Sequence, residues 1–116
     1  WLGRLEPGSA ALADAFSAAR VFALPSWFET PGLAALEAAA AGCSVVITPR
    51  GCAREYFGDW AHYASPDSPR SIRRALREAW RTPAEGRLAD RVRNLYSWAA
   101  IARQVQEVYE HVRRSA

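Results

Sequence analysis

Two carboxylates in the segment of residues 25–48 have a spacing that suits contact with one ligand. Glu29 comes just before an alanine-rich stretch, and Glu37 lies two turns inside it. At about 1.5 Å per residue, Glu37 would stand roughly 9 Å along a helix axis from Pro31, a distance that one ligand could span. Both glutamates also fit a purely structural interpretation. Glu29 would gain about 0.3–1 kcal/mol from the dipole of the following helix. Glu37 would reach solvent or pair with an arginine, because a bare buried carboxylate is costly.

The elements that would position these side chains are indicated by apolar runs and helix signals. Residues 21–24 and 44–48 are short apolar runs, as expected of strands buried in a parallel sheet. Pro31 has the φ of a first helical residue, residues 33–41 are rich in good helix formers, and Gly42 stands where a left-handed residue ends a helix. The predicted unit is strand, loop, helix, strand, with the strands as parallel neighbours and the helix packed on the sheet.

The loop between the first strand and the helix is the predicted ligand site. In open α/β folds, ligands bind at the carboxyl edge of the sheet. The N–H groups of Gly32, Leu33 and Ala34 would remain free at the positive end of the helix, which favours a phosphate group. Gly32, which has no side chain, would let a ligand approach.

The composition indicates one small domain. The 116 residues are 50% hydrophobic, and a chain of this size buries roughly two thirds of its unfolded surface. All fifteen basic residues are arginine, and the net charge is +3. Cys43 and Cys52 fit neither a redox pair nor a zinc spacing, so we interpret them as free thiols of a cytoplasmic protein. No run approaches the roughly 18 apolar residues of a membrane span. The chain contains no methionine, so we expect it to be part of a longer protein.

The remaining elements are predicted from caps, prolines and glycines. Residues 1–3 are interpreted as a strand end, residues 49–51 as a turn and residues 61–64 as an edge strand. The helix at 53–57, ended by Gly58, would point its N-terminus back at the site. Further helices are predicted after Ser9, from Pro69 to residue 81 behind the cap Ser68, from a capping box at 82–85 to residue 96, and after Ser97, with an apolar stripe of Ile101, Val105, Val108 and Val112.

At these residues the sequence resembles the retaining glycosyltransferases of family 4. The features it shares are the Leu-Pro-Ser strand end at 24–26, the pair Glu29 and Glu37, the alanine-rich helix before Gly42, and the two valines at 45–46. The segment 50–56 is similar to the family's glycine-containing turn followed by a glutamate, and residues 97–98 with 108–109 resemble its C-terminal helix. The resemblance covers nearly the whole chain. It implies an α/β fold, a partial Rossmann-like domain with a parallel sheet flanked by helices, from the C-terminal half of a GT-B type glycosyltransferase.

The resemblance also implies a donor site for a nucleotide-diphosphate sugar, with no obligatory metal and no other cofactor. Glu29 would be the catalytic residue, placed beside the anomeric carbon as an electrostatic and positioning group rather than as a nucleophile. Thr30, Gly32 and Leu33 would bind the sugar and the diphosphate. Glu37 would bind the ribose hydroxyls, the part that an acidic residue plays in dinucleotide folds.

The acceptor, a glycan or a lipid-linked molecule, would enter from an N-terminal domain that is absent from residues 1–116, as are the first strands of the donor domain. We expect no nucleic-acid partner, and a peripheral contact at the inner face of the membrane is left open. Pro31 departs from the family, which often has an aromatic residue there, and it cannot donate a hydrogen bond. Arg50 and Arg54, on a loop at the same edge, would either replace missing phosphate charge or be surface arginines.

A second class of function, a basic binding module, rests on an arginine stripe in the helix at 69–81. This stripe would bind nucleic acid or an anionic membrane surface, or it is simply a solvated face. His62 and His111 do not suggest a metal site, and Ser26 lacks the sequence context of a hydrolase nucleophile. Nucleotide-sugar binding that is lost in Glu37→Ala would favour the donor site over the basic binding module. The stripe consists of Arg70, Arg73, Arg74, Arg77 and Arg81, opposite Ile72, Leu76, Ala79 and Trp80.

Overall fold

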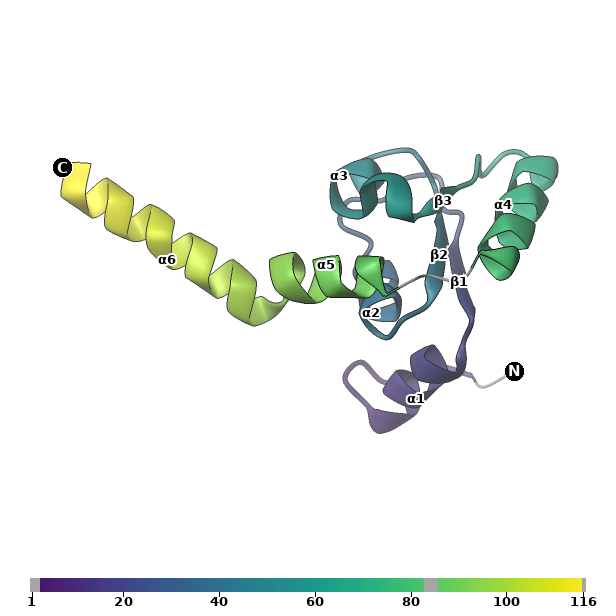
Figure 1. The fold of residues 1–116 in the computed structure, drawn as a ribbon, viewed down its shortest axis with the longest axis horizontal. Coiled ribbons are helices and arrows are strands. Elements are labelled where there is room, and N and C mark those ends of the chain that lie inside the picture. Colours follow the sequence, from purple (N-terminus) through teal and green to yellow (C-terminus); the bar gives the residue numbers. More distant parts are fainter. Residues whose placement is uncertain (1–2, 83–85, 116) are drawn as a thin grey trace.

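A computed structural model describes residues 3–82 and 86–115 and shows three parallel strands between helices (Figure 1). The strands are β1 (Val21–Leu24), β2 (Ser44–Ile47) and β3 (His62–Tyr63), in the spatial order β1-β2-β3. β1 pairs with β2 in parallel along its whole length, from Val21 opposite Ser44 to Leu24 opposite Ile47. β3 pairs in parallel with the end of β2. The predicted α/β fold with a parallel sheet flanked by helices is therefore confirmed.

The helices begin where the sequence places their caps. The hydroxyl oxygens of Ser9, Ser68 and Ser97 each accept a hydrogen bond from a backbone N–H three residues later, at 3.2, 3.2 and 3.3 Å. These bonds satisfy donors that a helix start leaves unpaired. The helices are α1 (Ala10–Ala18), α2 (Leu33–Ala40), α3 (Ala53–Phe57), α4 (Pro69–Arg81), α5 (Arg87–Tyr96) and α6 (Trp98–Ser115), with a short 3-10 helix η1 (Gly58–Trp60).

The core lies on both faces of β2, because side chains alternate along a strand. Val45 and Ile47 point to the face covered by α2 and α5, and Val46 points to the face covered by α4 (Figure 1). All four residues of β2 are buried, as predicted for a strand with covered faces. The larger cluster also contains Ala35, Leu36, Ala39, Ala53, Phe57, Ala61, Leu88 and Val92, and the smaller one contains Ala64, Ala75 and Ala79.

The connection from α2 to β2 is built from a glycine and a buried cysteine. Gly42 has a φ of +100° directly after the last turn of α2, so it is the left-handed residue that the sequence predicts. The thiol of Cys43 donates to the carbonyl oxygens of Phe16 and Ala19 at 3.1 and 3.3 Å, which ties the end of α1 to the start of β2. Burial raises the pKa of this thiol. Cys43 and Cys52 are both free, as expected.

Two predicted helix starts differ in the structure, and one predicted strand end lies mostly outside the described residues. α2 begins at Leu33 rather than at Pro31, because Gly32 adopts a left-handed conformation (φ +63°, ψ +59°) at the N-cap and excludes Pro31 from the helix. α5 begins at Arg87, after Gly86, and the predicted capping box falls largely on residues 83–85, outside the described residues. The strand end predicted at residues 1–3 also lies mostly outside them, and Gly3 belongs to no strand.

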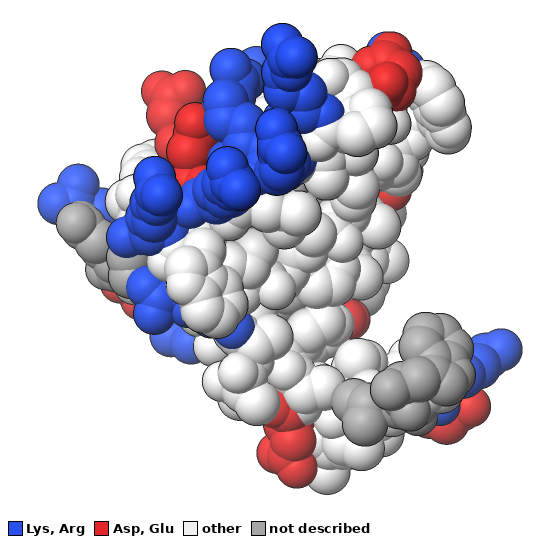
Figure 2. Space-filling model, turned by 90° about the vertical axis from the view of Figure 1, so that its right-hand side faces the viewer, with Lys and Arg blue, Asp and Glu red and all other residues white. Residues whose placement is uncertain are grey.

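Two helices present large exposed surfaces. α6 extends away from the body of the molecule, and three valines of its predicted apolar stripe, Val105, Val108 and Val112, are exposed (Figure 1). α4 covers the face of the sheet opposite to α2 and α5. Its arginines gather along one border of the surface that it exposes (Figure 2). Within the part of the chain that the structure describes, no helix is both long and apolar enough to cross a membrane.

Candidate functional site

The loop between β1 and α2 holds the side chain of Glu29 in one place. β1 ends at Leu24, and the chain then turns through residues 25–32 at the carboxyl edge of the sheet. The hydroxyl of Ser26 donates a 2.6 Å hydrogen bond to Oε1 of Glu29. Glu29 is half-buried. One carboxylate oxygen is therefore engaged within the protein, and Oε2 has no such bond among the described residues.

The backbone of Glu29 is fixed by the turn that follows β2. The N–H of Glu29 donates to the carbonyl oxygen of Arg50 at 3.3 Å, and the N–H of Cys52 donates to the carbonyl oxygen of Glu29 at 3.0 Å. These bonds form a parallel bridge between Glu29 and Gly51. Gly51 has a φ of +88°, and a Cβ atom there would lie 2.0 Å from the carbonyl oxygen of Glu29. Only glycine fits this contact.

The N-terminus of α2 follows Glu29 by three residues. A Cβ atom on Gly32 would lie 3.3 Å from Cδ1 of Ile47 and 3.7 Å from Oε2 of Glu29, so this buried glycine packs between the strand end and the carboxylate. Among the described residues, no acceptor is found for the N–H groups of Gly32, Leu33 and Ala34. Free N–H groups at the positive end of a helix favour an anion. Thr30 and Leu33 are exposed beside them.

Glu37 lies on the exposed side of α2, away from the core. Its carboxylate reaches solvent, which is one of the two outcomes of the structural interpretation that the sequence allows. It forms no hydrogen bond or ion pair with any other described residue. Glu37 borders a groove of about 330 Å³ between α1 and α2. The groove is also lined by Gly8, Ser9, Leu12, Ala13, Phe16, Ser17, Ala40 and Ala41.

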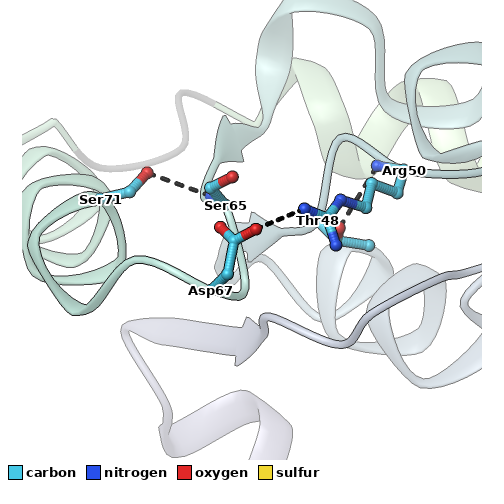
Figure 3. A network of polar contacts seen from close by, with 5 residues as sticks. All are labelled: Thr48, Arg50, Ser65, Asp67 and Ser71. Atoms are coloured by element: carbon cyan, nitrogen blue, oxygen red, sulfur yellow. Dashed lines mark hydrogen bonds and ion pairs between the residues drawn. The ribbon is translucent and has the colours of Figure 1, made fainter.

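Arg50 is held by partners within the protein. Nη2 of Arg50 lies 2.6 Å from Oδ2 of Asp67, and its guanidinium group stacks 5.1 Å from the ring centroid of Trp27. Figure 3 shows Arg50 and Asp67 pointing toward one another between the turn after β2 and the segment before α4. The hydrogen bond from Arg50 lowers the pKa of Asp67. In the same network, the N–H of Arg50 donates to Oγ1 of Thr48 and the N–H of Ser65 to Oγ of Ser71 (Figure 3).

Arg54 lies within α3, so the helix predicted at 53–57 is confirmed and the loop position expected for Arg54 is wrong. Its guanidinium carbon stands 4.1 Å from the ring centroid of Tyr63, a cation–π contact. The hydroxyl of Tyr63 donates to the carbonyl oxygen of Gly58 at 2.6 Å, and burial raises the pKa of Tyr63. Neither Arg50 nor Arg54 is therefore an unengaged charge beside the N-terminus of α2.

Two residues of this site have roles that the sequence alone does not reveal. The sequence places Ser26 at a strand end and argues against a nucleophile there, and the structure shows its hydroxyl bonded to the carboxylate of Glu29. Gly51 was assigned to a turn, whereas it is the contact that fixes the loop of Glu29. The available signals were the Ser-x-x-Glu spacing and the glycine after the second strand. Within the described part of the chain, no group of three or more His, Cys, Asp or Glu side chains could hold a metal ion.

Comparison with known proteins places this geometry in a family. The family model described as "Glycosyl transferases group 1" matches residues 1–82, which include β1, the loop of Glu29, α2 and the turn of Gly51. The chain belongs to the group 1 glycosyltransferases. A search of the curated proteins finds no match.

A solved structure supports the same assignment of this group 1 glycosyltransferase chain. This chain is similar to the structure of sucrose-phosphate synthase from Thermosynechococcus elongatus, with a TM-score of 0.76 and 27% sequence identity. The alignment covers 91% of this chain and 28% of that chain, so the chain spans little more than a quarter of that protein. Sucrose-phosphate synthase is a GT-B glycosyltransferase, and the expected resemblance to a GT-B fragment is confirmed.

Proposed function

We propose that this chain is the donor-binding part of a retaining glycosyltransferase, which moves a sugar from a nucleotide-diphosphate sugar to a glycan or lipid-linked acceptor. The observation that carries the proposal is the fixed position of Glu29 next to the free N–H groups of α2. A diphosphate is stabilised by such N–H groups and by the helix dipole. A carboxylate that needs no rearrangement stabilises developing positive charge most effectively.

The roles of the residues follow from their positions. Because Oε1 of Glu29 is held by Ser26, Oε2 is the atom that would face the donor sugar beside its anomeric carbon. Glu29 acts there as the catalytic residue through its charge and placement. Thr30 and Leu33, which are exposed, would contact the sugar and the diphosphate, and the buried Gly32 would do so through its backbone N–H group.

Glu37 would bind the ribose hydroxyls of the donor. Its carboxylate has no polar partner among the described residues and borders the groove between α1 and α2, so it is available to a ligand. A carboxylate on a sugar hydroxyl makes a charge-assisted hydrogen bond, which is stronger than a neutral one. The diphosphate is assigned to backbone N–H groups, and the proposal includes no metal and no other cofactor.

The acceptor side of the enzyme is assigned to residues outside this chain. The chain aligns with only 28% of sucrose-phosphate synthase, which leaves most of that protein without a counterpart here. We assign the glycan or lipid-linked acceptor to an additional, N-terminal domain, the location to the cytoplasm, and no role to nucleic acid. The chain alone should then transfer no sugar, because catalysis depends on holding both substrates together.

Titration calorimetry with a panel of UDP-, GDP- and ADP-sugars tests the proposal. We expect at least one of them to bind the chain, with weaker binding in Glu37→Gln. Glu107→Gln, which changes an exposed glutamate on α6, is the matched control and should bind normally. Absence of binding across the panel, or equal binding by Glu37→Gln and Glu107→Gln, contradicts the donor site. Sugar transfer by the chain alone above the level of Glu29→Ala contradicts the assignment of the acceptor to another domain.

The retaining course of the reaction needs a separate test in the complete enzyme. The anomeric configuration of the product, measured by NMR before it equilibrates, should equal that of the donor sugar. An inverted anomeric centre would overturn this part of the proposal and leave the donor site itself untouched.

A further inference from the structure

Arg50 joins three parts of the molecule that lie around Glu29. Its carbonyl oxygen accepts from the N–H of Glu29 at 3.3 Å, and its own N–H donates to Oγ1 of Thr48 at 3.3 Å. Thr48 is fully buried at the end of β2, so the backbone of Arg50 is fixed to the core. Nη2 of Arg50 lies 2.6 Å from Oδ2 of Asp67, just before α4 (Figure 3). One residue therefore links the loop of Glu29 with the end of β2 and the start of α4.

The side chain of Arg50 also holds a part of this loop that the backbone leaves free. Its guanidinium carbon lies 5.1 Å from the ring centroid of Trp27, two residues before Glu29. Neither Trp27 nor Phe28 forms a backbone hydrogen bond with a described residue. A cation and an aromatic face attract each other even at an exposed site. The stacking therefore holds the chain between Ser26 and Glu29 against the turn that follows β2.

Asp67, the ion-pair partner of Arg50, is itself held at the start of α4. The N–H of Ser65 donates to Oγ of Ser71 at 3.1 Å, and the N–H of Ser68 donates to the carbonyl oxygen of Ser65 at 3.1 Å. Hydrogen bonds from Arg50 and Ser65 lower the pKa of Asp67, so its carboxylate is charged at neutral pH. Exposed ion pairs are usually weak, because both side chains lose freedom when they meet. Here both partners stand on segments that are already fixed.

We propose that Arg50, paired with Asp67, is a positioning residue that keeps Glu29 in its catalytic place. This inference rests on the proposed function, in which Glu29 faces the donor sugar. In this role Arg50 does not touch the substrate. It restricts the loop before the donor binds, and such preorganisation avoids a rearrangement in the transition state. Direct binding of the donor diphosphate by Arg50 fits less well, because its charge is already paired with Asp67.

Hydrogen exchange of single N–H groups, measured by NMR on the chain itself, tests the positioning without any substrate. The N–H groups of Glu29 and Cys52 donate the two bonds that form the bridge at Gly51, and they exchange when the loop separates from the turn. Asp67→Ala removes the ion pair and should raise both rates about two- to fivefold. Arg50→Ala also removes the stacking and should raise them roughly 5- to 30-fold.

Two controls show whether the effect belongs to this contact. Arg74→Ala removes the exposed ion pair with Glu78 in α4 and should leave both exchange rates unchanged. Trp27→Leu removes the stacking and should raise the rates about two- to fivefold. Phe28→Leu, at the neighbouring exposed aromatic residue, should change them far less. Unchanged rates in Arg50→Ala, or rates raised equally by Arg74→Ala, would overturn the proposal.

Steady-state kinetics of the complete enzyme separates positioning from contact with the donor. Arg50→Ala should lower kcat by roughly tenfold and Asp67→Ala by less, because displacing a catalytic group by about 1 Å can cost 100-fold. The donor KM should stay near normal, since Glu29 acts mainly in the transition state. Asp67→Glu, which keeps the carboxylate, should recover most of the kcat. A contact of Arg50 with the diphosphate would instead raise the donor KM in Arg50→Ala but not in Asp67→Ala, which contradicts the proposal.

Failure of this inference can be told apart from failure of the proposed function. Normal kcat in Arg50→Ala, with a lowered kcat in Glu29→Gln, would overturn the positioning role alone. A lowered Tm of Arg50→Ala with normal kcat would mark the contact as merely structural. Absence of donor binding across the nucleotide-sugar panel, with faster exchange in Arg50→Ala, would overturn the proposed function, and with it the catalytic meaning of the hold on Glu29.

Discussion

The two glutamates of the site differ in how firmly the protein holds them. Glu29 has its N–H, its carbonyl oxygen and one carboxylate oxygen in hydrogen bonds within the protein. Glu37, eight residues later, is exposed and has no polar partner among the described residues. Ordering the side chain of Glu37 on a ligand costs entropy at that moment, whereas that of Glu29 is already ordered. The difference suggests that Glu29 acts on the transition state and Glu37 on binding.

Gly51→Ala should have the largest effect, because it removes the firm hold on Glu29. A Cβ atom 2.0 Å from the carbonyl oxygen of Glu29 cannot be accommodated, so the loop must separate from the turn. A non-glycine residue at such a φ costs about 1–3 kcal/mol. At about 4–8 °C per kcal/mol, this strain corresponds to a fall in Tm of roughly 4–24 °C. Calorimetry should detect no donor binding.

Gly42→Ala is the control for Gly51→Ala. Gly42 also has a positive φ, +100°, but nothing lies within 4 Å of its added Cβ atom. This variant should lose stability through backbone strain alone and keep its donor affinity. Equal donor affinity in the two variants would show that the Glu29–Gly51 bridge does not position the site.

Glu29→Gln should lower kcat in the complete enzyme by roughly 100-fold, on the scale of losing one preorganised electrostatic contact. The donor KM should change little, because the interaction is made mainly in the transition state. Steady-state kinetics with varied donor concentration measures both constants. A raised KM with normal kcat would place Glu29 among the binding residues and erase its contrast with Glu37.

Glu37→Gln should raise the donor KM and leave kcat closer to normal, the signature of a contact that persists through the reaction. Loss of a charge-assisted hydrogen bond, about 1.5–3 kcal/mol, corresponds to roughly 10- to 150-fold. Because Glu37 is exposed, the Tm of the Glu37→Gln variant should equal that of the unmodified protein. A large fall in Tm would instead mark Glu37 as a structural carboxylate.

Much of the fold is predictable because its signals are local. Serine caps, an apolar run and a glycine after a helix each act over a few residues, and they locate α1, β1, α2, β2 and α4. Pro31 shows the limit of such signals. A proline is favoured as a first helical residue, but here Gly32 follows it in a left-handed conformation, so the helix begins only at Leu33.

The site was less predictable because its contacts are not local. Gly51 meets Glu29 across 22 positions of sequence, and only the parallel pairing of β1 with β2 brings them together. For Glu37, the sequence leaves open whether the carboxylate reaches solvent, pairs with an arginine or binds a ligand. α2 has alanine on every side, so its sequence has no apolar stripe that would distinguish the buried face from the solvent face.

Ser26→Ala should have the smallest effect, because it removes one of three hydrogen bonds that hold Glu29 and leaves the backbone bridge intact. A net hydrogen bond is worth about 1 kcal/mol, so kcat should fall about fivefold. Ser26→Thr, which keeps the hydroxyl, is the matched control.

A double-mutant cycle shows whether Ser26 acts through Glu29. If it does, Ser26→Ala should have almost no further effect on kcat in the Glu29→Gln background, because residues in contact are not additive. Steady-state kcat of the four proteins gives the coupling energy directly. A full fivefold loss in both backgrounds would mean that Ser26 contacts the substrate itself. In that case the side chain of Glu29 would owe its fixed position to the bridge with Gly51 alone.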